Sequence, residues 1–264
     1  MPAGFRDMTD QSRASLAVCV ITRDEEDRIG DCLASVAFAD EILVVDSGST
    51  DRTVAIAREL GARVIVRDWP GYAAQKNFAQ GQVAAEWLLS VDADERVTPE
   101  LARQIRGLIA AAPDGIAGAS VPRRTWYLGR WIRHGGWYPG RKVRLARRGR
   151  GRWDGEHVHE RLVVEGAIQA LDGDLLHYTY RGIADHLRTI DRFTTEAARA
   201  MAARGARGAA LGMLVHPPLK FFKMYLLKAG FLDGVPGFVV AALGSYYVFL
   251  KYAKLWELRG AGRP

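Results

Sequence analysis

The sequence predicts an α/β protein that is built on a doubly wound, mostly parallel sheet and ends in an apolar helical appendage. Three observations lead to this prediction. Short apolar runs alternate with helix-length segments through residues 16–111, as in sheets whose strands are covered on both faces. Two of these runs end at Asp46 and Asp92, which places carboxylates at the carboxyl ends of strands, where such sheets bind ligands. A long apolar segment begins near His216.

The elements of the first half follow one another as strand and helix. The apolar runs predict strands over 16–21, 41–45, 63–66 and 87–89. The intervening segments predict helices over 26–37, from a cap at Ser49 or Thr50 to Gly61, over 73–80, and from Pro99 onward. This half is the one that we expect to bind a nucleotide.

From residue 117 to residue 180 the pattern changes to short β-like runs between glycine turns, such as 142–145 and 161–164. These runs predict antiparallel hairpins on one edge of the sheet, on the acceptor side. A helix is predicted over 183–204, and the Gly-, Ala- and Arg-rich stretch 205–212 is typical of a linker. We therefore expect a flexible N-terminus over 1–14, a main domain over 15–205 and a helical region over 206–264.

Composition limits the class of protein. A chain of 264 residues with 48% hydrophobic residues can bury a substantial core. Its two cysteines, Cys19 and Cys32, fall in a predicted strand and helix and form no metal-binding pattern. The polar residues 1–15 do not resemble a secretory signal, so we expect a cytoplasmic protein. A net charge of +7 favours an anionic partner, which leaves nucleic acid, nucleotide phosphates and an acidic membrane surface open.

The pair Asp92 and Asp94 is the strongest chemical signal in the chain. Two carboxylates one residue apart, at the end of a strand, offer hard oxygen ligands to a divalent cation, and such a site suits a diphosphate. Taken alone, the pair is also typical of a solvated turn. Asp46, at the end of an upstream strand, favours the ligand-binding interpretation.

Three motifs resemble glycosyltransferase family 2, the inverting transferases with the GT-A fold. They are residues 20–26 (VITRDEE), 44–51 (VVDSGSTD) and 91–94 (VDAD). Residues 136–139 (GWYP), 144–145 (RL) and 158–160 (VHE) are similar to the lipopolysaccharide-core β-1,4-glucosyltransferase branch. The resemblance covers roughly residues 15–200 and implies that the main domain is a GT-A domain.

The resemblance implies roles for residues of the first two motifs. Thr22 and Glu25 would line the nucleotide pocket, and Asp46 would accept a hydrogen bond from the N–H of uracil. A nucleobase that presents only hydrogen-bond acceptors would leave this carboxylate without a donor. The carboxylate would therefore give specificity for uracil. The alternative is that Asp46 only caps a helix or turn. Asp24 departs from the asparagine expected at its position, which is expected to alter local hydrogen bonding.

By the same resemblance, Asp92 would face the ribose or the metal, and Asp94 would bind Mg²⁺ or Mn²⁺ that bridges the donor diphosphate. His177, at the end of a β-like run, is a candidate for a further metal or phosphate contact. Lys76 and Arg144 are candidates for donor contacts. The basic segment around Arg144 is otherwise typical of a solvated face.

Inverting transfer also needs a base for the acceptor hydroxyl. The candidates are Glu160, His159 and Glu156, of which we favour Glu160. On a strand, Glu156 and Glu160 share one face whereas His157 and His159 share the other, so only one set can point into a cleft. The two histidines also leave a zinc site open, although no cysteine lies nearby to complete one.

The apolar tail has an uncharged run over 234–250 that is flanked by lysines and aromatic residues. Because Pro236, Gly237 and Gly244 interrupt the run, we predict an interfacial or re-entrant hairpin, with Asp233 at its turn, in place of a spanning helix. A buried core helix and an oligomer contact remain the alternatives. An anionic inner leaflet would attract the lysines.

Together these observations predict a metal-dependent, inverting hexosyltransferase that moves glucose from a UDP-sugar to a lipopolysaccharide inner-core heptose. The expected partners are the donor, a lipid-anchored saccharide and the cytoplasmic face of the inner membrane, and a homo-oligomer is left open. Other nucleotide sugars and a polyprenyl-phosphate acceptor are the nearest alternatives. We expect no nucleic acid, although the basic segment 141–150 beside Trp137 and Trp153 makes a nucleic-acid-binding protein one rival. A non-catalytic membrane scaffold is the other.

Overall fold

The computed structural model describes residues 14–111, 113–155 and 160–260. The described chain forms two compact units. The first unit contains the residues up to Arg123 together with Arg141–Leu176, and the second contains Arg124–Gly140 together with the residues from His177 onward. The division after residue 205 stays a prediction, and by contacts the segment 177–205 belongs to the second unit.

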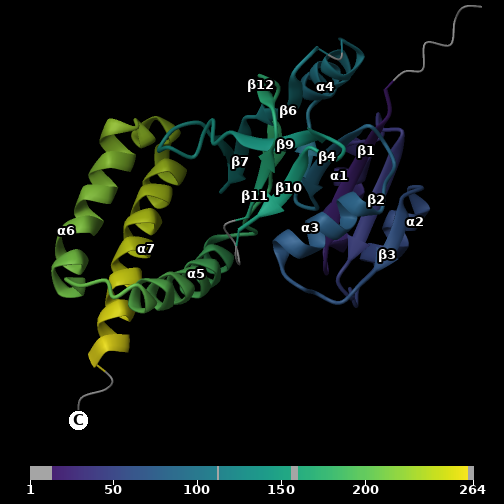
Figure 1. Cartoon of the computed structure of the whole chain (residues 1–264). Coiled ribbons are helices and arrows are strands. Elements are labelled where there is room, and N and C mark those ends of the chain that lie inside the picture. The colour runs from purple at the N-terminus through teal and green to yellow at the C-terminus, as the bar shows by residue number, and fades with distance from the viewer. Residues whose placement is uncertain (1–13, 112, 156–159, 261–264) are drawn as a thin grey trace, which may run out of the picture. The chain divides into compact units, whose positions relative to one another are not determined.

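The first unit is the α/β unit that the sequence predicts (Figure 1). Its helices are α1 (Glu26–Ser35), α2 (Thr53–Glu59), α3 (Tyr72–Gly81) and α4 (Pro99–Ala111). Its strands are β1 (Leu16–Thr22), β2 (Glu41–Asp46), β3 (Arg63–Val66), β4 (Trp87–Asp92), β5 (Glu95–Val97), β6 (Ile116–Val121), β9 (Lys142–Arg147), β10 (Gly151–Asp154), β11 (Arg161–Val164) and β12 (Ala167–Ala170). Strands β7 (Arg123–Tyr127) and β13 (Leu175–His177) each cross the boundary between the units.

A seven-stranded sheet in the order β12-β6-β9-β4-β1-β2-β3 forms the centre of this unit. Strands β4, β1, β2 and β3 run parallel. All seven residues of β1 are buried, so this strand is covered on both faces. The prediction of a mostly parallel sheet is confirmed.

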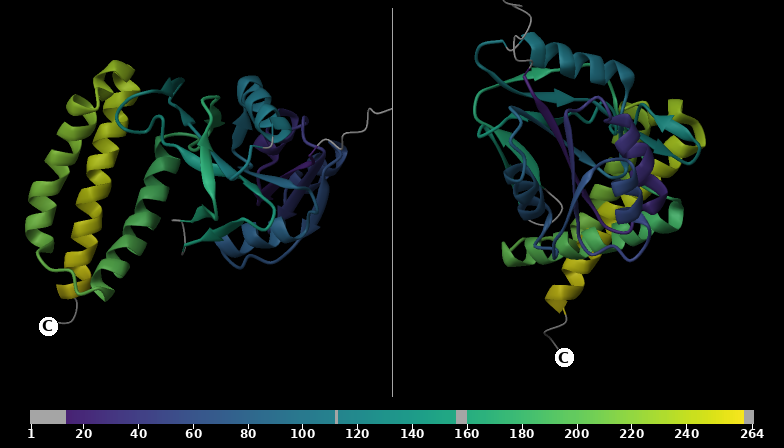
Figure 2. Two further views of the ribbon diagram at one scale, coloured as in Figure 1. Left: turned by 45° about the horizontal axis from the view of Figure 1, so that its top comes forward. Right: turned by 90° about the vertical axis from the view of Figure 1, so that its right-hand side faces the viewer.

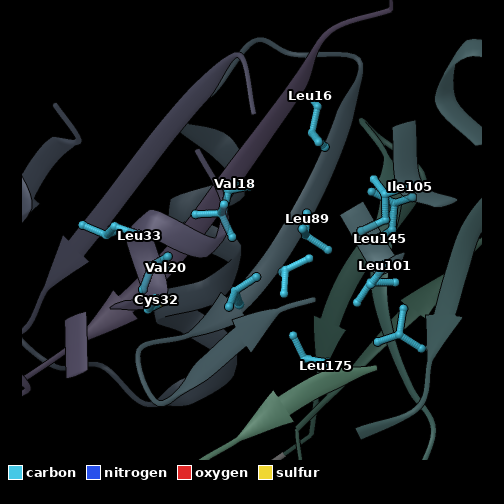
Figure 3. Close-up of a cluster of buried hydrophobic side chains, with 14 of the residues drawn as sticks. Leu16, Val18, Val20, Cys32, Leu33, Leu89, Leu101, Ile105, Leu145 and Leu175 are labelled. Atoms are coloured by element: carbon cyan, nitrogen blue, oxygen red, sulfur yellow. The ribbon is translucent and has the colours of Figure 1, made fainter. Parts of the chain in front are cut away.

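The two faces of β1 contact different helices because successive side chains point to opposite faces. Leu16, Val18 and Val20 join a core that α1 and α4 cover, and Figure 3 shows Cys32 and Leu33 of α1 and Leu101 and Ile105 of α4 in it. Residues 17, 19 and 21 form a second core with Ala79 of α3. The parallel strands are therefore clamped between helices, which holds their carboxyl ends in register.

The predicted edge position of residues 142–145 is wrong. They form β9, which runs antiparallel between β4 and β6 in the interior of the sheet. Because Arg144, Leu145 and Ala146 are all buried, this strand is covered on both faces like β1. Residues 161–164 do form a hairpin, in which β11 pairs with β10 in a separate two-stranded sheet.

The predicted helix cap at Ser49 or Thr50 is also wrong. Helix α2 begins at Thr53, after a loop over 47–52. The Oγ of Ser49 donates a hydrogen bond to Asp46 instead of capping a helix. Thr50 binds Asp24 across the loop. Side chains of the loop are therefore used for contacts between loops.

The second unit is mostly helical, with a small hairpin of β7 and β8 (Arg130–Ile132). Its helical elements are α5 (Ile183–Ala203), α6 (Ala209–Phe222), the π-helical turn η1 (Lys223–Leu227), the short 3₁₀ turn η2 (Gly230–Asp233) and α7 (Gly234–Gly260). Figures 1 and 2 show α6 and α7 side by side as an antiparallel pair. Helix α7 also packs against α5.

The hairpin of α6 and α7, with Asp233 at its turn, is as predicted, and it corrects the length of the predicted linker. The predicted linker 205–212 is shorter, because α6 begins at Ala209. The run over 234–250 is one continuous helix despite its glycines and Pro236. A Cβ on Gly237 would lie 2.0 Å from the carbonyl oxygen of Gly230, and one on Gly244 would lie 2.7 Å from Met224 Sδ. These glycines thus allow close packing and do not break the helix.

A buried aromatic cluster joins α5 to β7. His186 is 5% exposed and stacks on Tyr180 with ring centroids 4.0 Å apart. Its Nδ1 lies 2.9 Å from the hydroxyl oxygen of Tyr127. Burial lowers the pKa of His186 from 6.5 to about 4 and raises the pKa of Tyr127 to about 12. Both rings are therefore neutral at pH 7, and Nδ1 can accept the bond from the tyrosine.

We expect acid to destabilise this cluster. Because the pKa of His186 is lower in the folded chain than in the unfolded chain, the unfolded chain binds more protons between pH 6.5 and about 4. The free energy of unfolding should fall across that window by at most roughly 3 kcal/mol. Urea denaturation followed by tryptophan fluorescence measures it. His186→Phe should flatten the pH dependence and the exposed control His216→Asn should not, whereas an equal slope in all three proteins would contradict the assignment.

Candidate active site

Three parallel strands bring polar residues to one edge of the sheet. In the register of the sheet Thr22 lies beside Asp46, and Ile21 lies beside Asp92. The carboxyl ends of β1, β2 and β4 therefore place Thr22, Asp46 and Asp92 together, as the strand pattern predicts. Such an edge is where open α/β sheets bind ligands.

Asp46 organises the loop that follows β2. Its Oδ2 accepts the N–H groups of Gly48 and Ser49 at 2.9 and 2.8 Å. Its Oδ1 accepts the bond from the Ser49 hydroxyl. The residue is 1% exposed. Asp46 thus caps the turn, which was the alternative role considered for it. Each carboxylate oxygen has two lone pairs, so these bonds leave room for contact with a base, which stays a prediction.

The loops after β1 and β2 hold each other. Asp24 Oδ1 accepts the N–H of Thr50 at 2.8 Å, and the N–H of Asp24 donates to Ser49 Oγ at 2.8 Å. Glu26 accepts the N–H of Arg52, and Asp51 accepts the N–H of Glu26. These bonds satisfy N–H groups at the starts of α1 and α2, which have no partners within their helices.

The backbone conformation and contacts of Asp24 explain why aspartate is tolerated where asparagine is expected. Its φ is +51°, in the left-handed region that Asn and Asp adopt more readily than other residues with a side chain. The side-chain oxygen that binds Thr50 is one that both residues possess. The added charge changes neither requirement.

Asp92 lies between two buried cations. Its Oδ1 is 2.8 Å from Lys76 Nζ, and its Oδ2 is 2.7 Å from Arg144 Nη2. Burial by itself raises the pKa of Asp92, but Arg144 and Lys76 outweigh it and hold that pKa well below its usual range. Asp92 is therefore ionised, and both of its oxygens are paired.

Glu95 is a site residue that sequence reasoning missed. It is 0% exposed, accepts the N–H of Asp92 through Oε2, and lies 2.5 Å from Arg144 Nη2 through Oε1. Arg123 is a further cation at 3.8 Å. The only signal was its place directly after the Asp92 and Asp94 pair, and nothing in the sequence showed that it faces inward.

Lys76 links Asp92 to the predicted base. Its Nζ is 3.1 Å from Glu160 Oε1, and the ammonium group lies 4.3 Å from the ring centroid of Trp153. Asn77 fixes this helix, since its side-chain amide exchanges two 2.8 Å hydrogen bonds with the backbone of Trp153. Trp153 is 3% exposed and so is not available to stack on a nucleic-acid base.

Asp94 lies beside a different cation from those that pair with Asp92, whose side chain is 28% exposed. The side chain of Asp94 is 22% exposed, and Arg28 Nη1 lies 4.0 Å from its Oδ2 and 3.8 Å from Glu25 Oε2. Within the described residues no group of three or more His, Cys, Asp or Glu converges as a metal site. The residues present fit Mg²⁺ or Mn²⁺ only if substrate phosphates complete the coordination. Such ions are commonly bound by one or two protein carboxylates together with substrate phosphates.

The match to a family model decides what this edge of the sheet belongs to. Residues 17–170 match the model described as glycosyl transferase family 2. The chain belongs to glycosyl transferase family 2. The matched segment contains every polar residue of the edge, from Thr22 to Glu160.

The similarity to known relatives extends over nearly all of the chain. The chain is 33% identical over 249 residues to the lipopolysaccharide core biosynthesis glycosyltransferase LpsC of Rhizobium meliloti, with 92% of each chain covered. An uncharacterised glycosyltransferase of Rickettsia typhi is 29% identical, with 92% of this chain and 87% of the relative covered.

Solved structures show the GT-A fold. The mannosyltransferase PcManGT of Pyrobaculum calidifontis, in complex with GDP-Man and Mn²⁺, superposes with a TM-score of 0.54 at 14% identity, covering 93% of this chain and 88% of that one. Glucosyl-3-phosphoglycerate synthase of Mycobacterium tuberculosis, in complex with Mn²⁺, UDP and phosphoglyceric acid, superposes with a TM-score of 0.50 at 18% identity, covering 74% and 80%. At these identities the likeness is one of fold.

Thr22 is the clearest sign of a missing ligand in this transferase. Thr22 is 6% exposed, and its Oγ1 is buried without a hydrogen-bond partner among the described residues. A buried hydroxyl without a partner costs free energy unless a ligand or water satisfies it. Thr22 therefore fits a contact with a bound molecule.

The remaining predicted residues are placed as follows. His177 ends β13 and belongs to the second unit. Glu156 and His159 lie outside the described residues. Lys142 of β9 adds to the positive charge, and burial together with Arg123 and Arg144 lowers its pKa. The roles of all these residues stay predictions.

Removal of Arg144 should destabilise the transferase strongly. Arg144→Ala would leave Glu95 and Asp92 without their shared cation, and loss of one partner of a buried ion pair costs about 3–5 kcal/mol. Chemical denaturation measures the free energy of unfolding. The matched control is Arg152→Ala, whose side chain is 71% exposed and whose loss should cost no more than about 0.5 kcal/mol. Equal losses in both variants would contradict the buried-network interpretation.

Proposed function

We propose that this transferase moves a hexose, glucose in the first instance, from a UDP-sugar to a lipid-anchored saccharide with inversion at the anomeric carbon. The observation that carries the proposal is the juxtaposition of Asp94, the cation-lined Asp92 and Glu160 at one edge of the sheet. The family assignment makes the reaction a glycosyl transfer. The donor, the acceptor and the stereochemistry are the proposed parts.

The nucleoside would lie against β1 and β2. Thr22 offers its buried hydroxyl, and Asp46 offers lone pairs that suit the N–H of uracil. Glu25, three residues after Thr22 in the sequence, would line the same pocket. Guanine also presents N–H donors to a carboxylate, and PcManGT is in complex with GDP-Man, so GDP-sugars belong in any donor panel.

The diphosphate would meet positive charge. Lys76, Lys142 and Arg144 supply fixed cations, which favour the charge that develops on a departing nucleoside diphosphate. Asp94 would hold Mg²⁺ or Mn²⁺ together with the phosphate oxygens. When bound, the cation supplies Lewis-acid stabilisation of the leaving group.

Glu160 would act as the base. As the acceptor oxygen forms its bond to the anomeric carbon, the carboxylate takes the hydroxyl proton and the bond from that carbon to the phosphate oxygen breaks. Lys76 holds Glu160 in place at 3.1 Å. Because attack and departure occur on opposite faces of the sugar, a single displacement of this kind inverts the configuration.

The name of the Rhizobium meliloti relative supports lipopolysaccharide core as the acceptor class, with an inner-core heptose as the proposed target. A polyprenyl-phosphate acceptor is the alternative. Such acceptors are membrane-bound, so the transferase would work at the cytoplasmic face of the inner membrane. A helix over Gly230–Gly260, with a mean hydropathy of 1.3 in its apolar stretch, is long and apolar enough to cross a bilayer by length and composition alone.

The first test is donor turnover. Release of UDP from a panel of UDP- and GDP-sugars should require Mg²⁺ or Mn²⁺ and favour one sugar. Asp94→Asn should reduce it by about a hundredfold or more, whereas the exposed control Asp172→Asn, 86% exposed at its side chain, should leave it unchanged. Absence of nucleotide binding with or without cation would overturn the proposal.

Glu160→Gln separates the base from the donor site. Loss of a general base lowers kcat by about 10²–10⁴-fold, and donor affinity should stay within about threefold because the amide can still accept a bond from Lys76. Single-turnover transfer and nucleotide titration measure the two quantities. A normal kcat in this variant would transfer the base assignment to Glu156 or His159.

A further inference from the structure

The second unit exposes an apolar surface that the transfer reaction does not use. Most of the exposed large apolar side chains of the described chain lie after residue 210. On α6 they recur with helical spacing at Leu211, Leu214, Val215, Leu219 and Phe222. We name these five residues the α6 stripe. Leu214 is 76% exposed and Leu211 66%, so the described chain does not cover the stripe.

The stripe is the outer face of the helix and not a misplaced core. Gly212 and Pro217, which flank the stripe on α6, are buried and contact Tyr252 and Ser245 of α7. The apolar spacing i, i+3, i+4, i+8 and i+11 on the outer face is the pattern that normally faces a core. An apolar face of this kind on the outside indicates an interaction surface.

Lysines surround the hairpin that carries the stripe. Lys220, Lys223, Lys228 and Lys251 lie in α6, in η1, after η1 and in α7. The sole acidic residue between positions 209 and 256 is Asp233, which is 1% exposed and hydrogen-bonded to backbone N–H groups. The surface therefore combines apolar side chains with lysines, and residues 209–256 contribute no exposed acid to it.

The lysines are close enough together to affect the pKa of Lys220. Partial burial, followed by the proximity of Lys228, Lys223 and Lys251, lowers the pKa of its ammonium group. Its stem passes 3.9 Å from the position that a Cβ on Gly244 would occupy. Anionic groups at this surface would relieve the repulsion among the four lysines.

The contacts of α7 limit how deeply this unit can enter a bilayer. Lys254 Nζ lies 2.7 Å from Asp191 Oδ1 and from Thr195 Oγ1, both on α5. Helix α5 carries charged residues along its length, and charged side chains are costly in the hydrocarbon region. The C-terminal half of α7 is therefore held at a polar helix, which favours binding parallel to the surface over a complete span.

From this geometry we infer that the α6 stripe lies in the plane of an anionic phospholipid monolayer, with its leucines at the level of the acyl chains and the lysines among the headgroups. The inference rests on the proposed function, for which it names the surface that brings the transferase to its lipid-anchored acceptor. A second copy of the chain is the rival occupant. It is disfavoured because a symmetric pair would bring the same lysines together.

The hairpin also holds a loop that carries a family motif. Asp233 Oδ2 accepts the N–H groups of Arg133 and His134 at 3.0 and 2.7 Å. The N–H of Gly135 donates to the carbonyl oxygen of Lys228 at 2.9 Å. The segment that begins the GWYP motif, at Gly136, is thus attached to the end of the hairpin. Membrane binding of the hairpin would place this loop close to the lipid surface.

Vesicle flotation of the full chain tests the inference. The protein should float with vesicles of phosphatidylcholine and phosphatidylglycerol, bind phosphatidylcholine alone roughly tenfold more weakly, and dissociate as salt rises. Leu214→Glu combined with Leu219→Glu should reduce the partition coefficient by about a hundredfold. The matched control is Leu60→Glu combined with Val66→Glu, at exposed positions of the first unit, and it should float like the natural chain.

Three outcomes would overturn the inference. They are no flotation of the intact protein, equal flotation of the stripe variant, and a concentration-dependent dimer that the stripe variant abolishes without any flotation. UDP-sugar turnover measured in the same samples separates the two proposals. Flotation without turnover would refute the transfer proposal alone, whereas turnover without flotation would refute the membrane surface alone. Circular dichroism of both variants checks that they are folded.

Discussion

The buried guanidinium of Arg144 is the interaction on which the site depends. It lies between Asp92 and Glu95, and without it the fully buried Glu95 would lose the closer of its two cations, which is costly. Through Asp92 the network reaches Lys76, and through Lys76 it reaches Glu160. Segments around residues 76, 92–95, 144 and 160 are thereby connected by one set of ion pairs. The arrangement fixes the ammonium group of Lys76 and the guanidinium group of Arg144 before any ligand binds, as electrostatic preorganisation requires.

The position of β9 makes this network achievable. Because β9 runs between β4 and β6, Arg144 approaches Asp92 from a neighbouring strand of the same sheet. An edge hairpin could not deliver a buried cation there, since edge strands face solvent. The loops after β1 and β2 add a second constraint, in which the side chains of Asp24, Glu26 and Asp51 satisfy backbone groups of the opposite loop. The motif residues thus shape the loops at the carboxyl ends of β1 and β2.

The second unit contributes a surface of different chemistry. Small residues such as Gly212, Gly237 and Gly244 let α6 and α7 pack closely, and this close packing directs the larger apolar side chains outward. The same sequence pattern would be a core helix if another layer covered it. Its exposure, together with the lysines and a single buried acid, is the basis on which we infer a lipid-binding surface.

The order of strands and helices, the acids at strand ends and the family motifs were all readable from the sequence, because hydrophobic periodicity and turn residues are local signals. Asp94, Lys76 and Glu160 could be named as candidates on the same grounds. The sequence could not place β9 inside the sheet, choose Thr53 over Ser49 as the start of α2, or reveal Glu95, since each depends on which distant residues share an interior. Likewise, the apolar pattern of residues 209–260 predicted helices, but only the packing of α6 on α7 determined which face is left exposed. Local chemistry was determined by the sequence alone, and the pairing of charges and the exposure of faces were decided by the tertiary structure, because burial is a property of neighbours that are far apart in the chain.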